Sequence, residues 1–191
     1  RFAVGPFGGP FATVDGDASG VAEFHNVALT VPGGYRLRVY TDHQVADYRL
    51  RADLSRGPSL EVEPNQTPET ANPALPTLLA GSFRFRFAGT LPAGDTAGDY
   101  VALGTLDPGN VVTTEVFTGP YSALLAGEAV VSLFKAGNAT PVFSSSAAST
   151  YTVVDRDTYY ARVSSESHLG LYARYLLTLS VSDAVPPTIQ S

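Results

Sequence analysis

The stretch Phe83-Arg84-Phe85-Arg86-Phe87 decides the fold class of this 191-residue chain, because its aromatic and charged residues alternate strictly. Successive side chains of a β-strand point to opposite faces, so the three phenylalanines share one face and the two arginines share the other. The pattern predicts a strand with one buried face and one solvated face.

Similar runs predict that strands make up most of the chain. They lie at residues 21–30, 35–41, 47–54, 100–106, 111–117, 129–134, 150–154, 158–164 and 174–181. Clusters of Gly, Pro, Asn and Asp, such as Pro32-Gly33-Gly34, separate these runs and favour turns. A helical period is almost absent. We therefore predict an all-β fold of tandem antiparallel β-sandwiches of the jelly-roll or immunoglobulin-like type, with the first sandwich incomplete.

An internal repeat supports the tandem arrangement. Tyr35-Arg36-Leu37-Arg38-Val39 aligns with residues 159–163, and Tyr48-Arg49-Leu50 aligns with residues 175–177. The spacing differs by three residues, which we place in a hairpin loop between the two strands.

The repeat also predicts the division of the chain. The first copy contains nothing that matches the strands from Phe83 to Phe117, so we expect residues 1–58 to be the second half of a module whose opening strands lie upstream. Residues 59–184 then form a complete sandwich, and residues 185–191 form an exit linker. Half a sandwich exposes an apolar face and open edges, so we expect strands from outside residues 1–54 to cover its inward residues. These inward residues are Tyr35, Leu37, Val39, Tyr48, Leu50 and Leu54.

Charge and composition exclude several functions. The formal net charge is −6 and Lys135 is the only lysine, which argues against nucleic acid as a partner, because phosphate binding depends on clustered Lys and Arg. No apolar run approaches the roughly 18 residues of a spanning helix.

Motifs for catalysis are also missing. The chain has no Gly-x-Ser-x-Gly string for a nucleophilic serine, and His25, His43 and His168 have no paired spacing for zinc. We predict a protein that is not an enzyme, with no catalytic residues and no organic cofactor.

A family resemblance rests on motifs spread over the second module. Glu61-Val62-Glu63-Pro64-Asn65, then Thr70-Ala71, Gly81, Gly98-Asp99-Tyr100 and the strand at 159–163, resemble the bacterial pre-peptidase C-terminal domain. The resemblance covers residues 61–183 fully and 1–54 in part. It implies a compact jelly-roll-type sandwich appended to secreted proteases, collagenases or large surface proteins, usually without catalysis of its own. For residues 1–54 a bacterial Ig-like domain is the alternative, because Gly20-Val21-Ala22-Glu23-Phe24 and Gly34-Tyr35 also look like its late strands.

The same resemblance implies a calcium site. Collagen-binding relatives bind calcium through the acidic segment and through aspartates at the start of a later strand. The matching residues here are Glu61, Glu63, Asn65, Asp95 and Asp99. Ca²⁺ takes six to eight hard oxygen ligands, which these side chains can supply in part. Gln66 departs from the pattern, since the family often has Asp there, and the alternative is that these are ordinary solvated linker acids.

Three functions remain open on the sequence. The favoured one is a non-catalytic structural or adhesive module of a secreted or cell-surface bacterial protein. The second is a substrate-binding accessory domain of a secreted hydrolase of collagenase or protease type. The third is a subunit of an extracellular filament, completed by strands from a neighbouring chain. The expected partners are a protein or polysaccharide of the extracellular matrix or cell surface, or copies of the chain itself.

Overall fold

The computed structural model describes residues 2–5, 12–16, 22, 33–40, 47–50, 52, 59–79, 81–119, 122–170 and 172–183. The chain divides into two compact units, residues 1–54 and 55–191, and each is described on its own.

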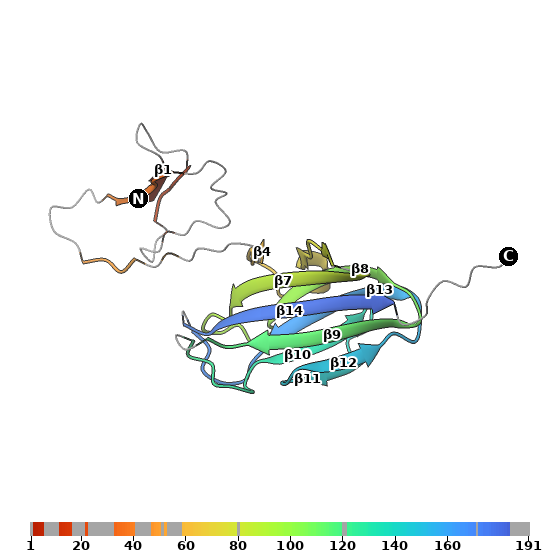
Figure 1. Ribbon diagram of the computed structural model, residues 1–191. Helices are drawn as coiled ribbons and strands as arrows, with labels where there is room; N and C mark the ends of the chain where they lie inside the picture. Colours follow the sequence, from red (N-terminus) through yellow and green to blue (C-terminus); the bar gives the residue numbers. More distant parts are fainter. Residues whose placement is uncertain are drawn as a thin grey trace. The chain divides into compact units, whose positions relative to one another are not determined.

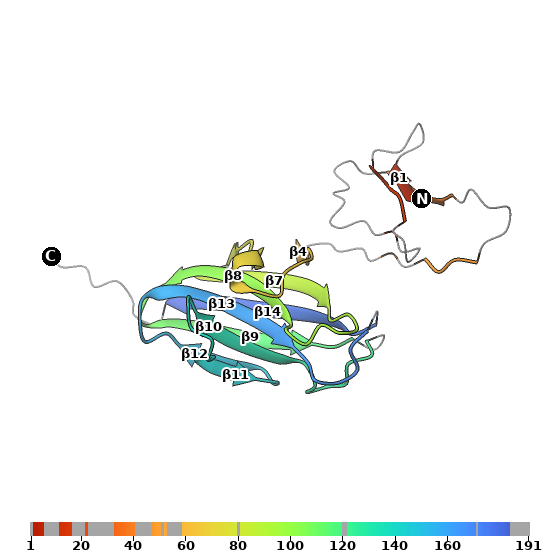
Figure 2. The same ribbon diagram turned by 180° about the vertical axis from the view of Figure 1, so that it is seen from behind.

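The second unit is a β-sandwich of two sheets, seen from opposite sides in Figures 1 and 2. One sheet has the order β11-β10-β13-β8-β5, and the other has the order β12-β9-β14-β7-β4, with β6 paired to β7. The strands are β4 (Ser59–Leu60), β5 (Asn72–Pro73), β6 (Thr77–Leu79), β7 (Ser82–Thr90), β8 (Asp99–Leu106), β9 (Asn110–Phe117), β10 (Val130–Lys135), β11 (Phe143–Ser145), β12 (Ser149–Thr152), β13 (Asp157–Ser164) and β14 (Arg174–Asp183); a 3₁₀ turn, η1, spans Pro68–Thr70.

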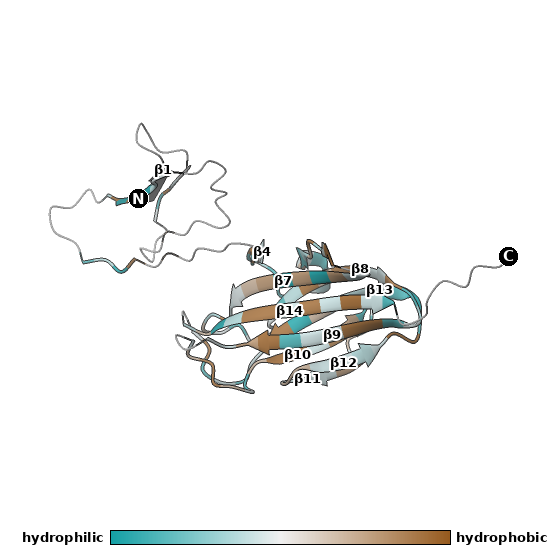
Figure 3. Cartoon of the chain, viewed as in Figure 1, coloured by the Kyte–Doolittle hydropathy of each residue, from teal (hydrophilic) through white to brown (hydrophobic). Residues whose placement is uncertain are grey.

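The core lies between the two sheets and follows the alternation of the sequence. Along β7, Phe85 and Phe87 are buried while Arg84 and Arg86 are exposed. Phe83 shares the inward parity but is 49% exposed, because it lies at the end of the sandwich beside β6. Figure 3 shows polar and apolar residues interchanging along β7, β14 and β9. The predicted all-β sandwich is therefore confirmed.

Most of the long predicted strands are present, but one connection is wrong. The runs at 100–106, 111–117, 129–134, 158–164 and 174–181 match β8, β9, β10, β13 and β14 closely. The predicted hairpin between the last two is absent, because β13 belongs to the five-stranded sheet and β14 to the six-stranded sheet. Alternation fixes which face of a strand is buried, not which strand is its neighbour. The pairing is also not wholly antiparallel, since β4 pairs with β7, and β5 with β8, in parallel.

The first unit contains a three-stranded antiparallel sheet with the order β2-β1-β3. Its strands are β1 (Phe2–Gly5), β2 (Ala12–Val14) and β3 (Arg36–Val39). The order and directions equal those of β11-β10-β13, and the aligned residues Leu37 and Ala161 pair with Val4 and Leu133 respectively. The sequence repeat thus extends to strand pairing.

The end of the first unit differs from the sequence prediction. Residues 47–50 and 52 form no strand, and Tyr48 and Leu50 are 65% and 50% exposed. Leu37 is also exposed, so these three expected inward residues are not buried. The alternation at 47–54 favours a strand, but a strand also needs a partner to pair with, which alternation does not provide. Leu54 and the predicted strand at 21–30, apart from Ala22, lie outside the described residues.

Candidate metal-binding site

The leading segment, residues 59–66, runs from one sheet of the sandwich to the other. Its strand β4 pairs with β7, and the pairing continues where the Glu61 amide donates to the Ala88 carbonyl at 3.0 Å. Four residues later, the Asn65 carbonyl accepts a hydrogen bond from the Tyr100 amide of β8 at 2.9 Å. The leading segment is therefore fixed to both sheets, and its acidic side chains lie at the start of β8.

The side-chain amide of Asn72 also holds the leading segment in place. The Asn72 side chain accepts from the Val62 amide at 2.7 Å and donates to the Val62 carbonyl at 3.0 Å. Asn72 is 5% exposed and belongs to β5, which pairs with β8. The residue between Glu61 and Glu63 is thus tied to the five-stranded sheet, which sets the direction of both carboxylates.

Three carboxylates converge on this position. Glu61, Glu63 and Asp99 each place one oxygen within 4.8 Å of the others. Asp99 is fully buried and both glutamates are partly buried, so the three acids are partly or fully removed from solvent. Asp99 opens β8, because Gly98 before it turns the chain at a φ of +77° and leaves no room for a Cβ beside the Val163 carbonyl.

Asn65 connects the carboxylates. It is 0% exposed, and in the amide orientation that satisfies its neighbours its nitrogen donates to Glu63 Oε2 at 3.2 Å and to Asp99 Oδ1 at 3.0 Å, while its oxygen accepts from Asn72 at 3.1 Å. A half-turn of the same amide places Oδ1 beside the two carboxylates instead. Asn65 can therefore serve as a donor to the carboxylates or as a fourth oxygen ligand beside them.

Asp95 lies in the loop before β8 and contributes charge to the site. It is 8% exposed, its Oδ1 accepts from the Gly98 amide at 3.0 Å, and its charge adds to burial and to the charge of Glu61 in raising the pKa of Asp99. The structure thus places Glu61, Glu63, Asn65 and Asp99 in one cluster, with Asp95 beside Asp99.

Three further residues complete the site, and sequence reasoning missed them. Tyr175 of β14 donates its hydroxyl to Asp99 Oδ2 at 2.7 Å. Thr90 donates to Glu61 Oε1 from its amide at 2.7 Å and from its hydroxyl at 2.6 Å. Gly89 leaves the space for both contacts, because a Cβ there would lie 2.3 Å from the Tyr175 hydroxyl and 2.4 Å from Glu61 Oε2. The sequence gives no sign of these roles. Gly89 and Thr90 look like an ordinary strand end, and Tyr175 looks like one more core residue of an alternating strand.

The electrostatics of the cluster are those of acids held out of water. Burial raises the pKa of Glu61, and burial together with the charge of Glu61 raises the pKa of Asp99. Burial and the neighbouring Asp99 also raise the pKa of Tyr175 well above its usual value. Without a cation, Glu61 and Asp99 therefore keep their protons to higher pH than ordinary carboxyl groups do, since burial and like charge both disfavour their ionised forms.

The donor set fits a hard divalent cation. All candidate ligand atoms are carboxylate or amide oxygens, which Ca²⁺ prefers, and the cluster contains no histidine or cysteine, which zinc prefers. Glu63 Oε1 and Asp95 Oδ2 are buried and have no hydrogen-bond partner, and buried polar atoms are seldom left in that state. A bound cation would give such oxygens a partner and replace the retained protons.

No protein-family model and no curated protein matches the chain. One similar solved structure is the crystal structure of Aeromonas hydrophila PliG, a periplasmic lysozyme inhibitor of g-type lysozyme. It is 15% identical, with a TM-score of 0.38, over 59% of this chain and 94% of that one, a similarity too low to bear on function. Among the residues described, no helix has the length and apolar character required to span a membrane.

Proposed function

We propose that the second unit is a non-catalytic structural or adhesive module of a secreted or cell-surface protein, of the pre-peptidase C-terminal type, and that calcium binds its leading segment to the sandwich. The observation that carries the proposal is the convergence of Glu61, Glu63 and Asn65 with Asp99. Two chain segments far apart in sequence supply these oxygens, so one cation would crosslink them.

Calcium would fix the path of the leading segment along the sandwich. Glu61 and Glu63 lie directly after the residues that join the two units, and the backbone on either side is bonded to β7 and β8. Metal ligation by these side chains adds strong bonds to a segment otherwise held by a few hydrogen bonds. A leading segment that is fixed to the sandwich resists being pulled away from it, which suits a structural or adhesive protein.

No catalytic residues are assigned. His168, the one histidine in the described ranges, is exposed and pairs with Glu128 at 2.9 Å. No described serine hydrogen-bonds to His168. It lies outside the cluster of Glu61, Glu63 and Asp99, so it is not a candidate metal ligand. The non-enzymatic role remains part of the proposal.

Thermal unfolding of the full chain tests the proposal. A ligand bound only by the native state stabilises it by RT ln(1 + [L]/Kd), about 2.7 kcal/mol at 100 times Kd. We expect millimolar Ca²⁺ to raise the Tm, Glu63→Gln to remove most of that rise, and Glu69→Gln to leave it unchanged. Glu69 is a matched control, because it is an exposed acid in the adjacent turn η1. Equal melting curves in calcium and in chelator would disprove calcium binding.

A further inference from the structure

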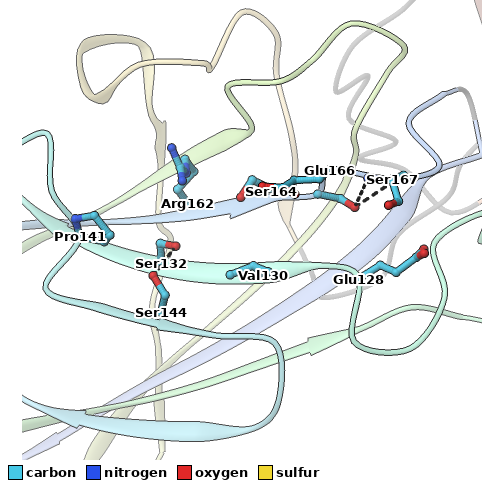
Figure 4. Close-up of a pocket in the computed structure, with 10 residues that line it drawn as sticks. Glu128, Val130, Ser132, Pro141, Ser144, Arg162, Ser164, Glu166 and Ser167 are labelled. Atoms are coloured by element: carbon cyan, nitrogen blue, oxygen red, sulfur yellow. Dashed lines mark hydrogen bonds between the residues drawn. The ribbon is translucent and has the colours of Figure 1, made fainter.

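A groove of about 440 Å³ crosses the outer face of the five-stranded sheet (Figure 4). Its floor is formed by β10, β11 and β13, which contribute Ser132, Ser144, Arg162 and Ser164. Glu128 and Glu166 lie toward one end of it. None of these residues belongs to the candidate metal site.

The strand register aligns the floor residues in a row. Tyr100 of β8 pairs with Arg162 of β13, Arg162 pairs with Ser132 of β10, and Ser132 pairs with Ser144 of β11. Paired residues of adjacent strands point to the same face of a sheet. Because Val163 and Val131, the neighbours of Arg162 and Ser132, are buried in the core, the row faces outward.

The guanidinium of Arg162 is fixed by stacking. Its central carbon lies 4.9 Å from the centre of the Phe134 ring and 5.9 Å from that of Tyr100. Phe134 and Tyr100 are 3% and 8% exposed, so little of either residue is open to solvent beside the guanidinium. An arginine held in this way retains its planar set of N–H donors with little remaining side-chain freedom.

Arg162 has no anionic partner in the part of the chain that the structure describes. Lys135, Arg156 and His168 form ion pairs there with Asp155, Asp107 and Glu128, but Arg162 forms none. Its Nε is buried and without a hydrogen-bond partner. A guanidinium binds a carboxylate through two parallel hydrogen bonds, so a carboxylate is the group that this side chain lacks.

Hydroxyl groups beside Arg162 define the rest of the ligand. Ser132 is 2% exposed, and its Oγ lies 2.8 Å from the Oγ of the exposed Ser144. With Ser132 as the donor in that bond, Ser144 keeps its own hydroxyl proton for a ligand. Ser164, Glu128 and Glu166 add further polar oxygens that can accept from hydroxyls. The lining therefore suits a ligand with many hydroxyl groups and one carboxylate.

The remaining features argue against other acidic ligands. The two glutamates and the net charge of −6 repel a dense polyanion. An acidic peptide would gain most from an apolar or aromatic pocket for an anchor residue, whereas Phe134 and Tyr100 are covered and serines dominate the lining.

We propose that this groove binds an acidic saccharide, with the sugar carboxylate on Arg162 and sugar hydroxyls on Ser144 and Ser164. The proposal rests on the adhesive role inferred above and deepens it by naming the class of ligand. Uronic and sialic acids carry the same carboxylate chemistry, and the experiment distinguishes them.

The test is an NMR titration of the full chain with three probes: methyl β-D-glucuronide, the neutral methyl β-D-glucoside and the methyl glycoside of N-acetylneuraminic acid. We expect at least one acidic sugar to shift the amides of residues 130–132, 144 and 162–167, and the glucoside to bind about tenfold more weakly or not at all. The acidic sugar with the larger effect identifies the source of the carboxylate. Equal binding of glucoside and glucuronide, or no shifts with any sugar, overturns the proposal.

Variants and a peptide probe complete the test. Arg162→Gln should weaken binding at least about tenfold, and Arg156→Gln, which removes an exposed arginine outside the groove, should leave it unchanged. Ser144→Ala, at an exposed position, should weaken binding without a risk to folding. Tighter binding of acetyl-Gly-Glu-Gly-amide than of either sugar would overturn the saccharide assignment. The calcium-dependent rise in Tm should persist in Arg162→Gln, so a failure of sugar binding and a failure of calcium binding are read separately.

Discussion

The Tyr175 hydroxyl donates a hydrogen bond to Asp99 Oδ2 at 2.7 Å, and the two residues belong to different sheets of the sandwich. Tyr175 is 3% exposed and packs within the core cluster, so its ring position is fixed by the apolar residues around it. The bond leaves Asp99 Oδ1 directed at Asn65. The packing of Tyr175 in the core thus determines the orientation of the Asp99 carboxyl group at the start of β8.

The first prediction removes this bond. Tyr175→Phe keeps the ring but leaves a buried carboxyl group without its donor, which should lower the free energy of unfolding by about 1–3 kcal/mol. We also expect weaker calcium binding, since Asp99 loses its fixed orientation. Urea unfolding and calorimetric titration measure the two effects. Tyr172→Phe is the control, because that tyrosine is exposed outside the site; similar behaviour of both variants would show that the Tyr175 hydroxyl has no special role.

The second prediction concerns the space at Gly89. In Gly89→Ala the new methyl group would meet the Tyr175 hydroxyl and Glu61 Oε2 at less than normal contact distance, so both must move. We expect the calcium-dependent rise in Tm to be lost or strongly reduced. Gly119→Ala provides the comparison, because the nearest atom to its Cβ is a Phe117 ring carbon at 3.6 Å. A full calcium response in Gly89→Ala would mean that Glu61 does not bind the cation.

The third prediction is a pH dependence of the metal-free protein. Burial raises the pKa of Glu61 to about 7 and also raises that of Asp99, above the ordinary values near 4 that these groups have when unfolded. Groups with a raised folded pKa stabilise the protein fully below the unfolded value, and this contribution is lost as the pH rises through the folded value. The free energy of unfolding in chelator should therefore fall from about pH 4 upward, through about pH 7 for Glu61 and on toward about pH 10 for Asp99.

Calcium should remove this fall, because a bound cation stabilises the ionised carboxylates. Denaturation series at several pH values, with calcium and with chelator, give the comparison. The carboxylates also have to lose protons to bind the metal, so calcium affinity should rise over the same pH range. Parallel pH profiles with and without calcium would argue that Glu61 and Asp99 are not ligands.

The fourth prediction tests the core. Leu177 is fully buried between the sheets, so Leu177→Ala should lower the free energy of unfolding by about 2–5 kcal/mol. Leu125→Ala should change it by less than about 0.5 kcal/mol, because Leu125 is 61% exposed. Chemical unfolding of both variants provides the measurement, and a small effect at Leu177 would be incompatible with the sandwich.

The sequence predicted the long strands well, and the reason is visible in β7 and β14. β14 alternates over nine residues, 174–182, and β7 alternates in sequence over the five residues 83–87; residues such as Phe87 and Leu177 are buried and their neighbours are more exposed. The short strands β4, β5, β6 and β11 have two or three residues each, too few for any period to be detected. The sequence did not reveal that the chain passes from one sheet to the other between β13 and β14, because a strand alternates in the same way in either sheet.

The candidate site was predicted in part, and through family resemblance rather than spacing. Glu61, Glu63 and Asn65 share one short acidic motif, and Asp99 matches a second motif at the start of a strand. Tyr175 and Gly89 could not be found in this way, because their roles depend on how two sheets pack face to face. Such contacts join positions far apart in the chain and leave no local pattern.

The parallel pairing of β4 with β7 has a mechanical consequence. A pull on the chain ahead of Ser59 reaches the sandwich first through this two-residue strand and the amide of Glu61, and only then through the tie between Asn65 and β8. The candidate ligands Glu61, Glu63 and Asn65 lie at or between these attachment points. A bound cation would therefore resist the pull together with the few backbone hydrogen bonds. Calcium concentration would then set the force at which the leading segment peels away from the sandwich, even where it hardly changes the fold.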